Sequence, residues 1–193
     1  MPCLTSPVLP ADTFSRTSQP TIPTGDGLLL RPWRTEDVPA VHAAFQDPVM
    51  HQWHIRTADS EEEVRGWVAE WRQAWGRERN VQWAVADAAD DRLLGRAALR
   101  EVVLGDGLAE VAYWTTAAAR GRGVAARATS ALAHWALDEI GFQRLELTHS
   151  VANEASCRVA GKAGFALEGT KRSALLHADG WHDMHLHACV RGD

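Results

Sequence analysis

The sequence predicts a mixed α/β fold, in which one mostly antiparallel sheet of about seven strands carries helices on both faces. Two stretches with helical spacing of apolar residues come first, within residues 35–78. Strand-like segments joined by short turns then fill residues 81–116, as in an antiparallel meander. A long helical stretch and another strand follow, and this crossover adds a parallel pair. The expected order is therefore β-α-α-β-β-β-α-β-α-β-β.

The beginning of the chain differs in composition from the rest. Residues 1–26 carry Pro, Ser and Thr without periodicity, and we expect them to form an N-terminal arm that is partly disordered. Residues 27–193 would then form the folded domain. Its first strand covers residues 27–33 (GLLLRPW) and stops at Pro32, which cannot donate to a sheet ladder.

Two helices precede the meander. Thr35 can cap the first helix, and Glu36 and Asp37 in its first turn favour the helix dipole. In the second helix, Ser60 and Glu63 have the spacing of a capping box. Each helix has an apolar stripe, formed by Val38, Val41 and Phe45 in the first and by Val64, Trp67, Val68, Trp71 and Trp75 in the second.

The helical and the alternating patterns of apolar residues also predict the remaining elements. The meander strands are residues 81–87, 92–103 and 108–116, the long helix covers 122–140 and ends at Gly141, and the next strand is 143–151. A short helix over 153–164 follows, with Asn153 as N-cap and Gly164 as terminator, and 165–176 and 181–190 are the closing strands.

Composition and charge exclude several classes of protein. The chain has 193 residues, 46% of them hydrophobic, and a formal net charge of −5, which fits one domain and argues against a nucleic-acid partner. Its three cysteines (Cys3, Cys157 and Cys189) lack CxxC spacing, so we expect no disulfide framework and a cytoplasmic location. The N-terminus does not resemble a signal peptide, and no apolar run reaches the roughly 18 residues of a membrane helix. We therefore expect no membrane partner, and either a monomer or a homodimer.

A glycine-containing turn lies between the third meander strand and the long helix. In the sequence ARGRGVAARA, Gly121 and Gly123 lack a Cβ and let the backbone approach a ligand closely, while Arg120 and Arg122 add positive charge. A turn that leads from a strand into a helix N-terminus directs backbone N–H groups and the helix dipole at an anion. The alternatives are a plain turn without a ligand and an RGG-type nucleic-acid segment, but such segments are repeated and this one occurs once.

Two motifs resemble a known family. Arg120-x-x-Gly123-x-Ala125 is similar to the acetyl-CoA motif of the GNAT superfamily of acyltransferases. Residues 151–169 (VANEASCRVAGKAGFALEG) resemble the branch that acetylates the N-termini of ribosomal proteins, in which Asn-x-x-Ser precedes Lys-x-Gly-Phe. The resemblance covers roughly residues 27–190 and implies the GNAT fold, in which the fourth and fifth strands splay apart.

The resemblance implies acetyl-CoA as co-substrate and no metal. The pantetheine arm would lie between the splayed strands, and the pyrophosphate would bind N–H groups of the glycine turn. The implied cofactor-binding residues are Tyr113, Trp114, Thr115, Arg120, Gly121, Arg122, Gly123, Val124, Ala125, Ala126 and Asn153.

The chemistry implied by the resemblance is the attack of a neutral amine on a thioester. Ser156, the serine of Asn-x-x-Ser, would stabilise the leaving thiolate by a hydrogen bond, since no tyrosine follows Tyr113; the alternative is a helix-capping hydroxyl. Glu110 would act as base through water, and the alternative is an exposed strand carboxylate. The branch's own base position corresponds to Leu175, which cannot titrate, and Glu168 nearby is interpreted as structural.

The acceptor pocket of this fold would be walled by the first two helices and the last hairpin. Trp53 and His54 are the candidates for stacking on an acceptor, and Asp183 either holds an ammonium or bonds to backbone. His182, His185 and His187 cluster in the last strand. Two of them, His185 and His187, share a face at a spacing that metals can use, but no third ligand is evident, so a polar strand face is favoured.

The sequence thus predicts an acetyl-CoA-dependent N-acetyltransferase that acts by direct attack in a ternary complex. A peptide or protein N-terminus is the expected acceptor, because of the branch resemblance. A small amine such as an antibiotic, polyamine or amino-acid derivative is the alternative, because Leu175 replaces the carboxylate. A non-catalytic acyl-CoA-binding module is the third hypothesis.

Overall fold

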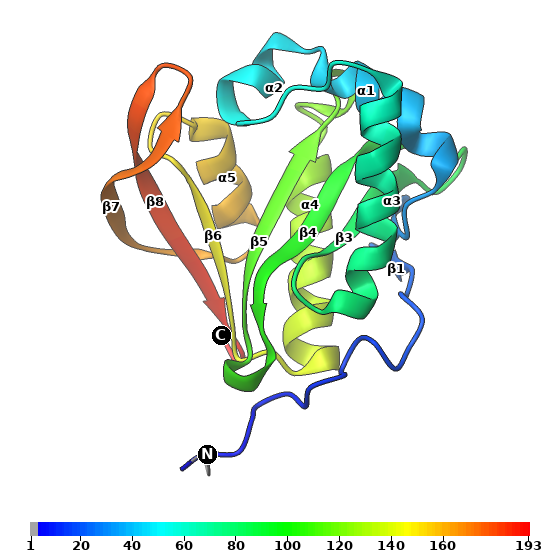
Figure 1. Cartoon of the computed structure of the whole chain (residues 1–193). Helices are drawn as coiled ribbons and strands as arrows, with labels where there is room; N and C mark the ends of the chain where they lie inside the picture. Colours follow the sequence, from blue (N-terminus) through cyan, green and yellow to red (C-terminus); the bar gives the residue numbers. More distant parts are fainter. Residues whose placement is uncertain (1–3) are drawn as a thin grey trace.

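A computed structural model describes residues 4–193 and contains one eight-stranded sheet (Figure 1). The spatial order of the strands is β1-β2-β3-β4-β5-β6-β8-β7, and only the β5–β6 pair is parallel. The strands are β1 (Ile22–Pro23), β2 (Leu28–Arg31), β3 (Val81–Asp87), β4 (Leu93–Val103), β5 (Leu108–Thr115), β6 (Arg144–Ser150), β7 (Ala166–His177) and β8 (Gly180–Val190). The predicted mixed, mostly antiparallel fold is confirmed, and β1 is the strand that the sequence did not indicate.

The helices lie on both faces of this sheet. They are α1 (Val38–Phe45), α2 (Pro48–Trp53), α3 (Glu61–Arg77), α4 (Val124–His134) and α5 (Glu154–Lys162), and α4 continues as a π-helical segment over Trp135–Ile140. Figure 1 shows α3 on one side of the sheet and α4 and α5 on the other. Among residues 4–193, no helix is both long enough and apolar enough to cross a bilayer.

Strand alternation divides the interior into two cores. In β3, Val81, Trp83 and Val85 face the core that contains α4, whereas Ala84 faces the core formed with α1 and most of α3. Trp114 of β5 belongs to the second core. Its side chain packs near Trp33, Phe45 and other apolar residues of that side.

The helix beginnings differ from the prediction at two places. Thr35 does not cap α1: Thr35–Asp37 form a 3-10 turn, and the Asp37 carboxylate accepts a hydrogen bond from Arg34 N–H at 2.8 Å. The helix α2 was not expected, although Asp47 caps it and Pro48 opens it. The predicted cap of α3 is present, since Ser60 Oγ accepts from Glu63 N–H at 3.2 Å.

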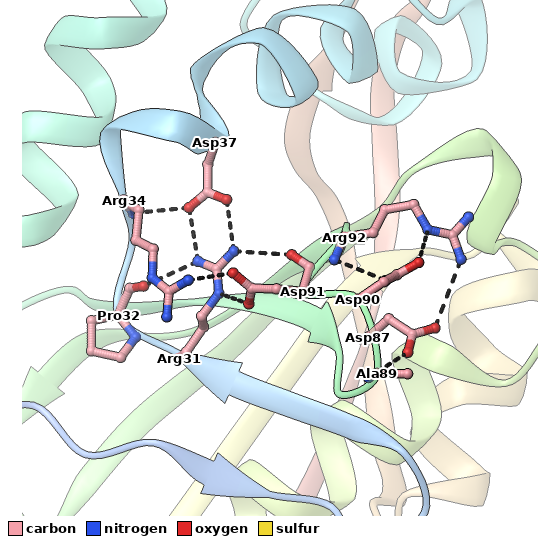
Figure 2. A network of polar contacts seen from close by, with 9 residues as sticks. All are labelled: Arg31, Pro32, Arg34, Asp37, Asp87, Ala89, Asp90, Asp91 and Arg92. Atoms are coloured by element: carbon pink, nitrogen blue, oxygen red, sulfur yellow. Dashed lines mark hydrogen bonds and ion pairs between the residues drawn. The ribbon is translucent and has the colours of Figure 1, made fainter.

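A buried ion pair fixes the turn before α1. Arg31, only 3% exposed, donates two hydrogen bonds to the Asp37 carboxylate, at 2.9 and 2.8 Å. Its Nε donates to Asp91 in the β3–β4 turn at 2.6 Å. Figure 2 shows this network, which joins β2, the start of α1 and the β3–β4 turn.

The segment expected as a partly disordered arm packs onto the domain where the structure describes it. Leu9, Phe14 and Ile22 are buried in the α4 core, and the ring of Phe14 lies 4.8 Å from that of Trp75. The Glu78 carboxylate accepts backbone hydrogen bonds from this segment at 2.7 to 2.9 Å. Met1 to Cys3, which the arm prediction also covers, lie outside the described residues.

The strands β5 and β6 separate after a short parallel contact. They pair only where Leu108–Glu110 oppose Arg144–Glu146, and each then continues without the other. Along β5, the N–H and C=O groups of successive residues point alternately toward β6 and toward β4. Gly107 C=O accepts from Arg144 N–H on the β6 side, and Thr116 N–H donates to Leu94 C=O on the β4 side. The backbone groups of Tyr113 and Thr115 therefore face the gap between β5 and β6.

Candidate active site

The glycine turn leads directly into α4. Gly121 and Gly123 have φ angles of 73° and 74°, a left-handed conformation that favours glycine, and Gly123 is the N-cap of α4. A Cβ on Gly121 would meet nothing within 4 Å, and one on Gly123 would meet only Arg127 Nε at 3.9 Å. Within the described chain, no side chain caps α4, so its first N–H groups are available to an anion over open space.

The arginines of the turn differ in their surroundings. Arg120 Nη1 lies 2.7 Å from Asp47 Oδ2, and Arg120 Nη2 is buried without a partner among residues 4–193. Arg122 is exposed. Further along α4, Arg127 pairs with Asp26 at 3.2 Å beside a shallow hollow of about 490 Å³.

Residues on the α5 side of the gap are linked to β5. Tyr113 Oη donates to the backbone C=O of Ser156 at 3.5 Å, and burial raises the pKa of Tyr113 to about 12. Asn153 Oδ1 accepts from Ser156 N–H at 3.0 Å and so caps α5. Asn153 thus makes the cap, and the hydroxyl of Ser156 has no hydrogen-bond partner within residues 4–193.

The opposite face of the gap carries a different set of polar groups. Glu110 Oε1 accepts from Thr148 Oγ1 at 2.6 Å across the two strands. Further along the same face of β6, Ser150 Oγ lies 2.7 Å from His182 Nδ1. Nε2 of that histidine lies 2.8 Å from Asp179 Oδ1. A carboxylate and a Ser-His-Asp chain thus lie on one face, and the sequence did not indicate the roles of Thr148 and Ser150.

The predicted acceptor residues have different positions. Trp53, at the end of α2, has its ring 6.4 Å from that of His182, so it does lie beside this polar face. His54 packs edge-on against Phe45 at 5.2 Å, and burial, with smaller contributions from nearby arginines, lowers its pKa to about 4. Asp183 accepts from Ser173 N–H at 2.8 Å, which matches the backbone-bonding alternative.

Two further residues of the last hairpin have simple surroundings. Leu175 is 38% exposed on β7, opposite His182 in register. Glu168 accepts from Arg144 at 2.8 Å, and this bond lowers the pKa of the glutamate. Glu168 therefore has the ion-pair contact that its structural interpretation requires.

The histidine pair of β8 has more neighbours than the sequence indicated. The ligand atoms of His149, Cys157, His185 and His187 all lie within 4.8 Å of one another. The sequence showed no third candidate donor beside His185 and His187, and the structure places two there, His149 of β6 and Cys157 of α5. His182 lies apart from this cluster, bonded to Ser150 on the other face. Burial lowers the pKa of His149 and of His187.

A family model and curated relatives both match the chain. Residues 27–166 match the model described as "Acetyltransferase (GNAT) domain". "Probable N-acetyltransferase YjcK" of Bacillus subtilis (strain 168) is 27% identical over 127 residues, which cover 65% of this chain and 70% of that protein. "Ribosomal-protein-serine acetyltransferase" of Escherichia coli (strain K12) is 29% identical over 101 residues, 52% and 56% of the two chains.

Solved structures share the fold at lower identity. A ribosomal L7/L12 alpha-N-protein acetyltransferase in complex with coenzyme A superposes with a TM-score of 0.82 at 22% identity, covering 89% of this chain and 98% of that one. The microcin C7 self immunity acetyltransferase, in complex with acetyl-CoA and AMP, gives 0.79 at 16% identity, covering 86% and 94%.

Proposed function

The chain belongs to the GNAT acetyltransferase family, and from this premise we propose that it transfers the acetyl group of acetyl-CoA to a primary amine in a ternary complex. The observation that carries this proposal is the gap between β5 and β6, which begins after Glu110 and opens beside the glycine turn. A strand edge with free backbone groups and an uncapped helix N-terminus lie together there. This pairing suits an amide-containing arm that ends in a pyrophosphate.

Binding of the co-substrate would rest mainly on backbone groups. N–H groups from Gly121 to Ala126, including those of Arg122, Val124 and Ala125, would bind the pyrophosphate. The free edge of β5 at Tyr113 and Thr115 offers hydrogen bonds to the pantetheine amides, and Asn153 borders the gap from α5. Trp114 presents no group to the gap, because its side chain is buried in the core and its backbone faces Arg96 of β4.

Residues of the chain can take the proton of the amine and stabilise the leaving thiolate. Acetyl-CoA supplies the thioester that the amine attacks. Glu110, held by Thr148, would accept the proton of the incoming amine through water. The unpaired hydroxyl of Ser156 would donate a hydrogen bond to the leaving thiolate, since both its backbone groups are fixed by Asn153 and Tyr113.

We propose a peptide or protein N-terminus as the acceptor, and we place its binding site beside Trp53. The reaction would take place in the cytoplasm. An α-amino group has a pKa of about 8, so a useful fraction is neutral near pH 7 and a weak base suffices. The name of the Escherichia coli relative supports this class. The competing class, a small amine, is favoured by Leu175, which leaves that hairpin position without a carboxylate.

Thiol release from acetyl-CoA, measured with peptides and small amines in parallel, tests the proposal. We expect turnover with peptides that carry a free N-terminus and none with the same peptides blocked at that amine. Turnover confined to small amines would overturn the acceptor class. CoA binding without turnover on any amine would support the non-catalytic module instead.

The role of Ser156 has its own test. Ser156→Ala should lower kcat by about tenfold while leaving the Kd of CoA unchanged, because one hydrogen bond to a charged group is lost. Ser130→Ala, on the exposed face of α4, is the matched control. An unchanged kcat in Ser156→Ala would remove the serine from the mechanism.

A further inference from the structure

Four side chains from three elements converge between α5 and the β6–β8 pair. His149 comes from β6, His185 and His187 from β8, and Cys157 from α5. Pairing places His149 directly opposite His185, and their side chains share the face that α5 covers. Cys157 directly follows Ser156 in the sequence, and the cluster lies on the side of the sheet opposite Glu110.

Two histidines of the cluster have a backbone carbonyl beside Nδ1. His149 Nδ1 lies 2.8 Å from Ser150 C=O, and His187 Nδ1 lies 3.4 Å from Phe165 C=O. A carbonyl oxygen only accepts, so the short Ser150 contact places the proton of His149 on Nδ1 and leaves its Nε2 lone pair free, whereas the longer Phe165 contact leaves both tautomers of His187 open. Metal-bound histidines show this arrangement, in which the second ring N–H donates to a backbone carbonyl.

The Nε2 atoms of His149 and His187 face each other. His149 Nε2 and His187 Nε2 are 3.1 Å apart, and the two side chains are 6% and 3% exposed. At this distance either one nitrogen donates a hydrogen bond to the other, or both lone pairs share a cation. A shared cation satisfies both nitrogens without placing the charge on either ring.

The other two members complete a set of soft donors. His185 Nδ1 is buried and has no hydrogen-bond partner among residues 4–193. Cys157 is a half-buried free thiol within 4.8 Å of all three imidazoles. Zinc ligands at about 2.0–2.3 Å would stand roughly 3.3–3.8 Å from one another, so side-chain shifts of about 1 Å would close the site.

We propose that His149, Cys157, His185 and His187 bind a zinc ion. Three imidazoles and one thiolate without a carboxylate suit zinc rather than calcium or magnesium. Four protein ligands leave no open position, so the ion has a structural role and fixes α5 to β6 and β8. The proposal does not depend on acetyl transfer, because its readouts are metal content and stability.

Metal titration of the full chain tests this site. Protein stripped with EDTA under reducing conditions should take up one equivalent of Zn²⁺ that survives dialysis, and its Tm should rise. With Co²⁺ as probe, a tetrahedral spectrum with a thiolate charge-transfer band is expected. Zn²⁺ should also slow the reaction of one thiol with a disulfide reagent, and this measurement needs no variant.

Two cysteine variants localise the site. Cys157→Ser should abolish the Co²⁺ charge-transfer band, whereas Cys189→Ser, on the same face of β8 but outside the cluster, should retain it. Likewise His187→Asn should release the metal and His182→Asn should not. Loss of Zn²⁺ on dialysis, or a charge-transfer band that persists in Cys157→Ser, would overturn the proposal.

Discussion

Arg120 Nη1 lies 2.7 Å from Asp47 Oδ2, so an arginine of the glycine turn binds a carboxylate at the start of α2. The same carboxylate caps α2 by accepting from Val49 N–H at 2.9 Å. That backbone bond, and to a lesser degree Arg120, lowers the pKa of Asp47. The ion pair therefore links the proposed CoA loop to the helix that carries Trp53.

This link predicts separate effects for the two arginines. Arg120→Ala should raise the KM of the acceptor more than the Kd of CoA, because α2 loses its contact with the loop. The fold should survive, since a partly exposed pair is worth only about 0–1 kcal/mol. Arg122→Ala, at an exposed position, should instead weaken CoA binding a few-fold. Calorimetric titration measures the Kd of CoA and steady-state kinetics measure the KM of the acceptor in both variants. If Arg120→Ala raises the Kd of CoA more than the KM of the acceptor, the proposed link between the loop and α2 is wrong.

Gly123→Val should abolish CoA binding. The φ of 74° is costly for any side chain and most of all for a β-branched one, so the turn would rearrange and its N–H groups would lose their common direction. Gly66→Ala is the control: it lies on α3 with open space around a new Cβ, and it should stabilise the protein slightly. An intact CoA affinity in Gly123→Val would show that the cradle lies elsewhere.

Features of the site that depend on a local sequence pattern could be predicted. Strand alternation placed Glu110 on one face with Trp114, and the spacing after Asn153 indicated the helix that carries Ser156. Pairing across strands and helix docking could not be read in this way. His149 meets His187 only through the β6–β8 register, and Cys157 reaches them only because α5 packs against β6.

The arm and α2 escaped prediction for different physical reasons. The segment around Phe14 has no period of its own and is held by side chains distant in sequence, including Trp75 and Glu78. The helix α2 has six residues, too few for an apolar period, and only Asp47-Pro48 marked its start.

Arg31→Met should destabilise the fold by about 3–5 kcal/mol, because the buried Asp37 carboxylate would lose its partner (Figure 2). Urea unfolding followed by circular dichroism measures this difference. Arg65→Ala removes the exposed pair with Glu62 and should cost less than about 1 kcal/mol. Equal effects in the two variants would mean that burial of the Arg31 pair is unimportant.

Acidification should reveal the burial of His54. Its pKa falls from 6.5 to about 4 in the folded state, so between these values the unfolded chain binds the proton and the folded chain does not. The free energy of unfolding should therefore fall as pH decreases through this window and level off below it. Burial also lowers the pKa of His149, His177 and His187. The pH dependence of the unfolding free energy in the parent protein is therefore the sum of several histidine contributions.

The His54 contribution is the difference between the parent and His54→Gln. Urea unfolding at several pH values should give a shallower dependence in this variant than in the parent. Parallel curves for His54→Gln and the parent would refute a buried, neutral His54.

Glu110→Gln should lower kcat by about 10²-fold with the Kd of CoA unchanged. The amide oxygen can still accept from Thr148 Oγ1, so the face keeps its geometry, but the amide cannot take a proton. Glu146→Gln is the matched control, because Glu146 opposes Glu110 in register and is bonded to Arg144 at 3.0 Å. Steady-state kinetics across pH compare these variants with His182→Asn. If only His182→Asn loses kcat, the Ser150–His182–Asp179 chain takes the proton and Glu110 serves to hold the gap open.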